Sequence, residues 1–323
     1  MVDKRICVEL LYNSRLPYRT LAQHFGLTIK SIRKRVTKLV EQGVIRKFYL
    51  TLNRTACGSD VETKFILGQL WTDGTEHDDA LIQQLGNNIR IYRVFKTTRN
   101  SFGFYAMAIG FQGLSDLTEF VQRIDCVTKL ETDSLIFVLS PGLWPKLTNW
   151  HLPKVQNLTK DQWHVVRYLK DDPRMPIADL ARATGQPVRR VRKTINLLIE
   201  TRYVVATIRW APAAAGHVEA FLRTDLDLNQ SSREKFANWL YDKYPLACWD
   251  ALSVADSPST VIQYVSAPTI HILDEIEKTV RAAPFTKNVD LLVTYRQHRF
   301  DGLREHRLGQ LLNHAGLNAL NSQ

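Results

Sequence analysis

The sequence predicts an α+β protein in which two winged helix-turn-helix domains alternate with two ferredoxin-like (βαββαβ) domains. Three observations lead to this fold class: a basic amphipathic helix occurs twice, the chain aligns with itself at a fixed shift, and strand-like and helical segments follow each basic helix in the order βαββαβ. With 323 residues, 45% of them hydrophobic, the chain is long enough for several cores.

The first basic helix is predicted within residues 28–47. Its apolar positions recur at helical spacing and are expected to share one buried face: Ile29, Ile32, Val36, Leu39 and Val40. Thr28 is the expected N-cap and Gly43 the expected residue after the C-terminus. Lys and Arg occupy the other sides, so we expect a helix that is packed on one side and cationic on the other.

The segments on either side complete a recognisable arrangement. Residues 15–28 predict a shorter helix that opens at Pro17 and ends at Gly26. A helix, a turn with glycine and a basic helix form a helix-turn-helix, whose second helix enters the DNA major groove. Residues 44–53 are β-prone, and we expect a wing hairpin that brings Arg46 and Lys47 near phosphates.

Excess positive charge is confined to two segments. Residues 28–47 hold seven Lys and Arg against one Glu, a net charge of +6, and residues 187–210 hold six against one, a net charge of +5. The rest of the chain is therefore neutral, since the total is +11. Charge concentrated on two comparable helices indicates a polyanion, and double-stranded DNA is the partner that we predict.

The second basic segment is the counterpart of the first. A shift of 159 residues, without a gap, superposes identical residues: Arg15 on Arg174, Pro17 on Pro176, Gly26 on Gly185, Arg33 on Arg192, Lys34 on Lys193 and Glu41 on Glu200. The unlike pairs are Thr28 and Pro187, Ser31 and Arg190, Arg35 and Thr194, and Gly43 and Arg202. The second helix therefore loses its N-cap hydroxyl but is richer in arginine at its start.

The repeat sets the predicted domain organisation. It comprises a winged helix-turn-helix at residues 1–53, a ferredoxin-like domain at 61–140, a linker with Pro and Trp at 141–157, a second winged helix-turn-helix at 158–212, a second ferredoxin-like domain at 216–297 and a helical tail at 298–323. We expect the tail to form a helix docked on its own domain.

Composition argues against several classes of protein. No run of eighteen apolar residues exists, and several of the first eleven residues are charged. We therefore predict no membrane partner and a cytoplasmic, nucleoid-associated location. The cysteines are far apart and are predicted to be free thiols: Cys7, Cys57, Cys126 and Cys248. The histidines are not spaced with other metal-ligating residues as in a metal site, and no Gly-rich phosphate loop or G-x-S-x-G motif is present. We therefore predict no metal, no cofactor and no catalytic residue.

Five short motifs of the first half belong together. They are D-x-x-I at Asp3 to Ile6, R-x-P-x-x-x-L-A at Arg15 to Ala22, G-L-T at Gly26 to Thr28, R-V at Arg35 and Val36, and L-x-x-x-G-V-I at Leu39 to Ile45. Together they resemble the Lrp/AsnC family of transcription regulators. The resemblance implies a winged helix-turn-helix joined to a ferredoxin-like sensing domain called RAM, here in tandem duplication. It also implies that the α/β domains pair through their sheets, which a fused chain could do internally; a homodimer or higher oligomer stays open.

The resemblance further implies an effector site near a G-x-x-D turn between the central strands. Residues 97–105 and 255–264 occupy that place, and neither contains the motif. An amino-acid effector is therefore not expected, and the site of any small-molecule effector is unassigned. Arg99, Asn100 and Ser101 are expected to be turn residues rather than an anion site.

The candidate DNA contacts are residues of the two basic helices and the first wing: Thr28, Lys30, Ser31, Arg33, Lys34, Arg35, Lys38, Arg46, Lys47, Arg189, Arg190, Arg192 and Lys193. Two alternatives stay open. Sirohaem decarboxylases share this layout, but they need a His and an Arg at a hairpin where this chain has Arg93 and Arg99 without a His. The other alternative is a protein-interaction adaptor with a degenerate second winged helix.

Overall fold

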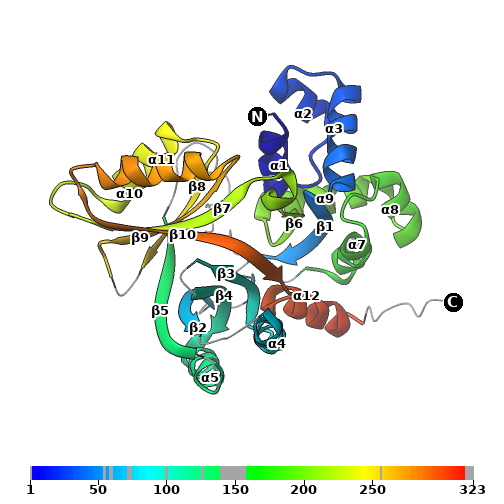
Figure 1. Cartoon of the computed structure of the whole chain (residues 1–323). Helices are drawn as coiled ribbons and strands as arrows, with labels where there is room; N and C mark the ends of the chain where they lie inside the picture. Colours follow the sequence, from blue (N-terminus) through cyan, green and yellow to red (C-terminus); the bar gives the residue numbers. More distant parts are fainter. Residues whose placement is uncertain are drawn as a thin grey trace. The chain divides into compact units, whose positions relative to one another are not determined.

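The structure is a computed structural model that describes residues 2–53, 56–57, 61–70, 75–98, 101–124, 127–138, 158–254 and 257–316. The predicted linker at 141–157, the turn residues Arg99 and Asn100, and Cys126 lie outside the described residues. The chain forms two compact units (Figure 1). The helical unit contains the described residues of 1–59, 149–215 and 304–323, and the barrel unit contains those of 60–148 and 216–303.

The same order of elements occurs twice along the chain. The first half contains α1 (Val2–Tyr12), α2 (Tyr18–Phe25), α3 (Ile29–Glu41), β1 (Ile45–Leu52), β2 (Val61–Leu70), α4 (Thr75–Gly86), β3 (Ile91–Thr97), β4 (Ser101–Ile109), α5 (Gly110–Gln122) and β5 (Val127–Val138). The second half contains α7 (Lys160–Asp171), α8 (Ile177–Thr184), α9 (Val188–Thr201), β6 (Val204–Trp210), the short 3₁₀ helix η2 (Pro212–Ala215), β7 (Val218–Leu226), α10 (Arg233–Lys243), β8 (Cys248–Val254), β9 (Thr260–Ala267), α11 (Ile270–Arg281) and β10 (Thr286–Arg299). A last helix, α12 (Leu303–His314), follows.

The helical unit is built around a two-stranded antiparallel ribbon of β1 and β6, one strand from each half. Phe48 pairs with Ile208 and Tyr49 with Thr207. The shift of 159 places Phe48 on Thr207 and Tyr49 on Ile208, so the pairing is reciprocal and the ribbon has a local two-fold axis. Helix α1 packs on β6 and α7 packs on β1, so the first helix of each half covers the strand of the other half.

The predicted wing hairpin is therefore wrong. Residues 45–52 contain none of the turn-forming residues Gly, Pro, Asn or Asp, so the segment continues as one strand without folding back. The hydrogen-bonding edge that a second wing strand would have filled pairs instead with β6. Arg46 and Lys47 consequently lie at the start of a ribbon that both halves share.

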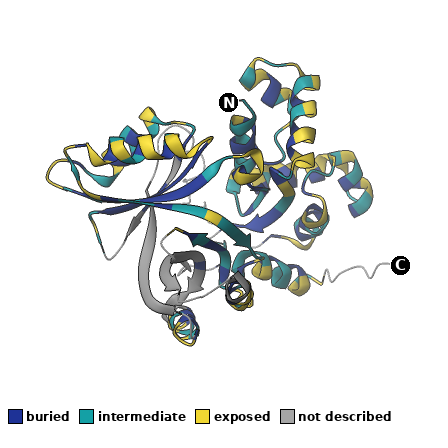
Figure 2. Ribbon diagram, viewed as in Figure 1, coloured by how far each residue is buried: buried dark blue, intermediate teal, exposed yellow. Residues whose placement is uncertain are grey.

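The barrel unit closes in the strand order β10-β3-β4-β2-β5-β8-β9-β7. Each half contributes four consecutive strands of that ring, in the antiparallel order expected for a βαββαβ segment. The two halves meet at two seams, β10 with β3 and β5 with β8. Helices α10 and α11 bury Phe236, Leu240 and Ile276 in one core on the strands of the second half. Figure 2 draws β7, one of these strands, mostly as buried.

The tail forms α12, which packs within the helical unit. Leu308 and Leu312 are buried, and Arg304 Nε donates to the carbonyl of Leu52 at the end of β1. Among the helices of the described residues, none is long and apolar enough to cross a membrane.

Candidate nucleic-acid interface

Helix α3 begins and ends where its sequence predicts. Thr28 Oγ1 accepts a hydrogen bond from the backbone N–H of Ser31 at 3.1 Å, which is an N-cap. Ile32, Val36 and Leu39 are buried and fix the helix to its domain. Gly43 follows the C-terminus with a φ of 70°, a conformation that glycine adopts at little cost.

The buried face of α3 is narrower than predicted. Ile29 is 45% exposed and Val40 is 42% exposed, so the expected burial of these two residues is wrong. They lie in the first and last turns, beyond the part of the helix that its neighbours cover. Val188 and Ile199, their counterparts on α9, are exposed to the same extents of 45% and 42%. The two helices are therefore seated in the same way.

Four of the five cations of α3 point to solvent and, among the described residues, have no acidic partner. Lys30, Arg33, Lys34 and Lys38 are exposed, and within the described part of the chain no carboxylate forms an ion pair with any of them. Residues three and four positions apart lie on one side of a helix, so these four form one cationic stripe. An unneutralised stripe of this kind is suited to an anionic surface.

Helix α9 carries a comparable stripe. Pro187 stands at its N-cap and forms no side-chain cap, as the sequence predicts. Arg189, Arg192 and Lys193 are exposed, and in the regions that the structure describes none of them pairs with a carboxylate. Arg190 is also exposed, but its Nη1 lies 2.8 Å from Asp161 Oδ2 at the start of α7.

Five cations on other described helices each form an ion pair with a carboxylate within one turn. The pairs are Arg123 with Glu119, Arg167 with Asp171, Arg182 with Asp179, Lys278 with Asp274 and Arg281 with Glu277. Such pairs suit a solvated surface and contribute little to stability. The stripes of α3 and α9 lack such pairs among the described residues, so their adjacent cations stay unneutralised.

Arg35 and the two basic residues of the ribbon are placed differently from the stripe. Arg35 Nη1 lies 2.7 Å from Asp3 Oδ1, so this half-exposed side chain joins α3 to α1. Its prediction as a DNA contact is not supported by this position. Arg46 and Lys47 are exposed at the start of β1, and Lys47 Nζ lies 5.8 Å from the centre of the Tyr49 ring. Ser31 is half-buried, and its backbone N–H serves the cap.

An exchange of arginines forms a joint between the two halves of the helical unit. Arg15 Nη1 donates to the carbonyl of Pro173 at 2.6 Å and its Nη2 to that of Met175 at 3.0 Å. Arg174, its counterpart, donates to the carbonyl of Ser14 at 2.5 Å. Burial, reinforced by the charge of Arg174, lowers the pKa of Arg15, and burial likewise lowers the pKa of Arg174. The alignment contained these arginines as an identical pair, but sequence reasoning gave them no role.

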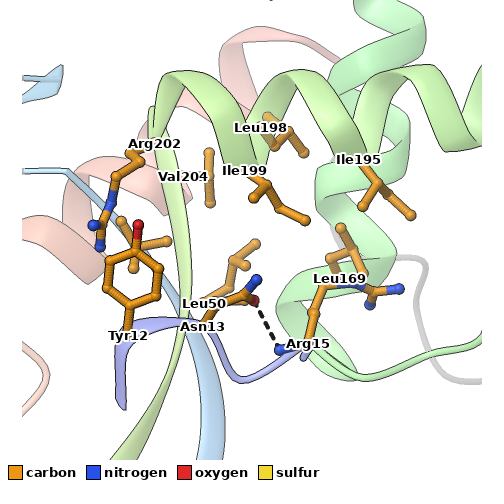
Figure 3. Close-up of a pocket in the computed structure, with 12 residues that line it drawn as sticks. Tyr12, Asn13, Arg15, Leu50, Leu169, Ile195, Leu198, Ile199, Arg202 and Val204 are labelled. Atoms are coloured by element: carbon orange, nitrogen blue, oxygen red, sulfur yellow. Dashed lines mark hydrogen bonds between the residues drawn. The ribbon is translucent and has the colours of Figure 1, made fainter. Parts of the chain in front are cut away.

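A hollow of about 40 Å³ lies at this joint beside the C-terminal half of α9 (Figure 3). Its wall is mainly aliphatic: Leu50, Leu169, Ile195, Leu198, Ile199, Val204, Val205 and Ala206. Its polar groups already have partners: Arg15 N–H donates to Asn13 Oδ1 at 2.9 Å, and the Arg202 guanidinium lies 4.4 Å from the centre of the Tyr12 ring. The hollow therefore offers no arrangement of acid, base and nucleophile.

The barrel unit holds a partly buried polar network that the sequence did not reveal. Arg93 Nη2 donates to Gln297 Oε1 at 2.7 Å, Gln297 Nε2 donates to Glu219 Oε2 at 2.5 Å, and Tyr264 O–H donates to Glu219 Oε1. Burial, together with the charge of Glu219, raises the pKa of Tyr264. No motif announces these residues, because both halves contribute to the group and only the strand seam brings them together. Among the described residues, no cluster of His, Cys, Asp and Glu could hold a metal ion.

Comparison with known proteins identifies the first segment. Residues 2–46 match the winged helix-turn-helix DNA-binding family. An HTH-type transcriptional regulator of Pyrococcus abyssi is 38% identical over 60 residues, 19% of this chain and 41% of that protein, so the chain spans about two fifths of that relative's length. The HTH-type transcriptional regulator FL11 of Pyrococcus abyssi is 26% identical over 140 residues, 43% of this chain and 87% of that protein.

One solved structure is similar to this chain over almost its whole length. The siroheme decarboxylase NirDL covers 98% of this chain and 100% of its own, with a TM-score of 0.57 and 12% sequence identity. At that identity the likeness concerns the fold alone. The comparisons thus give a helix-turn-helix segment of DNA-binding type within a mixed fold of helices and sheets.

Proposed function

We propose that this protein is a sequence-specific regulator of transcription, of the Lrp/AsnC type, that binds double-stranded DNA through both α3 and α9. One observation carries the proposal: most cations of these two helices are exposed and, within the described residues, have no carboxylate partner, whereas five cations on other helices are paired within a turn. Most of the affinity of such proteins comes from neutralised phosphates, so free cations on a recognition helix are what the ligand requires.

The proposal treats the chain as two fused copies of a winged helix-turn-helix and a RAM-type domain. The repeated order of elements, the reciprocal β1–β6 ribbon and the two strand seams support this. Two recognition helices related by a two-fold axis bind half-sites about one helical turn, roughly 34 Å, apart. An effector that acts through the RAM-type domains, and assembly beyond one chain, belong to the same proposal.

The test is the salt dependence of binding to duplex DNA. Lys34→Ala with Lys193→Ala removes one matched cation from each stripe, and the slope of log K against log salt should fall by one to two units, about 0.9 per lost phosphate contact. Lys235→Ala, an exposed lysine on α10 in the barrel unit, is the control and should leave the slope unchanged. Footprinting should reveal two protected half-sites. An unchanged slope in the double variant, or a single protected half-site, contradicts the proposal.

A decarboxylase-like enzyme is the second candidate. It is favoured by the fold likeness to NirDL and by Arg93, Glu219 and Tyr264, which gather an arginine, a carboxylate and a phenol inside the barrel unit. Against it, the described residues of the β3–β4 hairpin contain no His. Titration of the full chain with sirohaem separates the two: we expect no change in tetrapyrrole absorbance, and saturable binding without DNA affinity would favour the enzyme.

An adaptor with a degenerate second winged helix is the remaining alternative. Pro187 and Thr194 replace the Thr28 cap and Arg35, which are changes that weaken a recognition helix. Gel shifts with the full chain, carrying Ala at Lys34 alone or at Lys193 alone, resolve this. If only the first substitution reduces affinity, the second helix does not contact DNA.

A further inference from the structure

The stripes that α3 and α9 present differ in chemistry although they are seated alike. At matched positions the first stripe reads Lys30, Arg33, Lys34, Thr37 and Lys38. The second reads Arg189, Arg192, Lys193, Asn196 and Leu197. Arg33 and Lys34 are matched by the identical residues Arg192 and Lys193, so the two stripes differ only at the two ends of the exposed face.

The second stripe has two arginines and an asparagine, which are side chains that read bases, where the first has one arginine and no asparagine. Arginine binds guanine N7 and O6 with two hydrogen bonds, and asparagine binds adenine N6 and N7 in the same manner. Arg189 and Asn196 are exposed and, within the described residues, neither has a hydrogen-bond or ion-pair partner. Lys30 and Thr37, at the matched positions, lack this paired geometry.

The first half instead carries more cations toward the end of the recognition helix and beyond it. Lys38, Arg46 and Lys47 are exposed, whereas their counterparts Leu197, Val205 and Ala206 are uncharged. Lysines and arginines in these positions neutralise phosphates and fix the protein on the duplex without reading its sequence. The first half has therefore kept the positioning charges that the second half has lost.

We propose, on the basis of the DNA-binding function above, that the two winged helices divide the recognition of one operator. The first anchors the chain on phosphates, and the second reads bases through Arg189 and Asn196. Because both helices belong to one chain, nothing requires the half-sites to be alike, and the operator is directional rather than palindromic. Arg189 and Asn196 are seven residues apart, about 10 Å along the helix. The half-site under α9 thus contains a guanine and an adenine at separate base pairs.

Selection of binding sites from a random duplex library by the full chain tests this. We expect a motif with a strong G and A in one half and weak preferences in the other. Arg189→Lys with Asn196→Thr gives α9 the residues of α3; preference for G and A should fall by about 5- to 150-fold per base, while the salt slope stays unchanged. The reciprocal variant, Lys30→Arg with Thr37→Asn, should add G and A to the other half and make the motif more palindromic.

Lys38→Ala with Arg46→Ala is the matched control for the anchor. It should weaken binding to every duplex alike and lower the salt slope by up to about two, without changing the selected motif. A palindromic motif with the wild-type chain, or an unchanged motif in both exchange variants, overturns the division of recognition. If the wild-type chain retains no duplex even at low salt, the DNA-binding function itself fails, which is a different result.

Discussion

Compared position by position, α3 and α9 keep the same buried side and change the exposed one. The buried pairs are Ile32 with Val191, Val36 with Ile195, and Leu39 with Leu198, all aliphatic. Lys30 with Arg189 and Thr37 with Asn196 are exposed pairs, and exposed Lys38 is matched by half-buried Leu197. Interior positions tolerate little change because packing is dense, whereas surface positions are limited mainly by what they bind. The difference teaches that the two halves are one scaffold with two unlike surfaces.

Loss of either arginine at the joint between the two halves should lower the stability by the same amount. Arg15→Ala and Arg174→Ala each remove charged hydrogen bonds to carbonyls of the other half, and each should lower the free energy of unfolding by about 2 kcal/mol. Urea denaturation followed by circular dichroism measures this. Arg19→Ala, an exposed arginine on α2, is the control and should change stability by less than about 0.5 kcal/mol. A large loss of unfolding free energy in only one of the two variants would show that the two halves do not contribute equally to the joint.

Cys7 provides the next contrast, since its counterpart is Val166 and both are buried. Burial, reinforced by the charge of Asp3, raises the pKa of Cys7 from its ordinary value near 9 to about 12. The folded state therefore holds this proton more tightly than the unfolded state. Its contribution to stability is complete below pH 9 and is lost as the pH rises toward 12.

Cys7→Val gives the first half the residue of the second and removes that dependence. Relative to the variant, the wild-type chain should lose about 1 kcal/mol of unfolding free energy between pH 9 and pH 10. Urea midpoints of both proteins from pH 7 to 11 measure it. Burial also raises the pKa of Cys57, but this residue is present in both proteins and cancels. Parallel curves would mean that the thiol does not couple to folding.

The sequence alone predicted the structural features that depend on neighbouring residues. The cap at Thr28, the absence of one at Pro187 and the order of the strands follow from residue type and spacing, and the structure confirms them. The prediction of a wing hairpin failed because the sequence of one strand is the same whether it folds into a hairpin or pairs with a distant strand. Only tertiary contacts decide which strand it pairs with. The network of Arg93, Gln297, Glu219 and Tyr264 spans more than 200 residues of sequence and has no periodicity to reveal it.

The candidate DNA contacts include some residues whose placement the sequence predicted and one whose placement it did not. Spacing was enough to place Lys30, Lys34 and Lys193 on exposed faces, since a helix repeats every 3.6 residues. Spacing could not tell that Arg35, one position on, reaches Asp3 of another helix. Ion pairs between elements depend on how the elements pack, which no single stretch of sequence specifies.

A smaller effect separates the starts of the two recognition helices. Thr28→Ala removes the cap on Ser31 N–H and should lower the free energy of unfolding by about 1 kcal/mol. Pro187→Ala removes no cap and should change it by less than about 0.5 kcal/mol. Thermal unfolding of both variants measures the difference. Equal losses would mean that the hydroxyl of Thr28 contributes nothing that Pro187 lacks.

The smallest effect concerns the ends of the same helices. Arg202 adopts a φ of 51° where the first half has Gly43, and a side chain in this region costs on the order of 1 kcal/mol. Stacking of Arg202 on Tyr12 returns about 0.5–1 kcal/mol. Arg202→Gly loses the stacking but also the strain, so stability should change by less than about 0.5 kcal/mol. Arg202→Ala loses the stacking and keeps the strain, so it should be about 1 kcal/mol less stable than the glycine variant. Urea midpoints measure both, with Gly43→Ala as the matched change in the first half, where we expect a loss of about 1 kcal/mol. If the alanine and glycine variants at 202 are equally stable, the backbone strain is absent, and the two helix ends differ only in what their side chains contact.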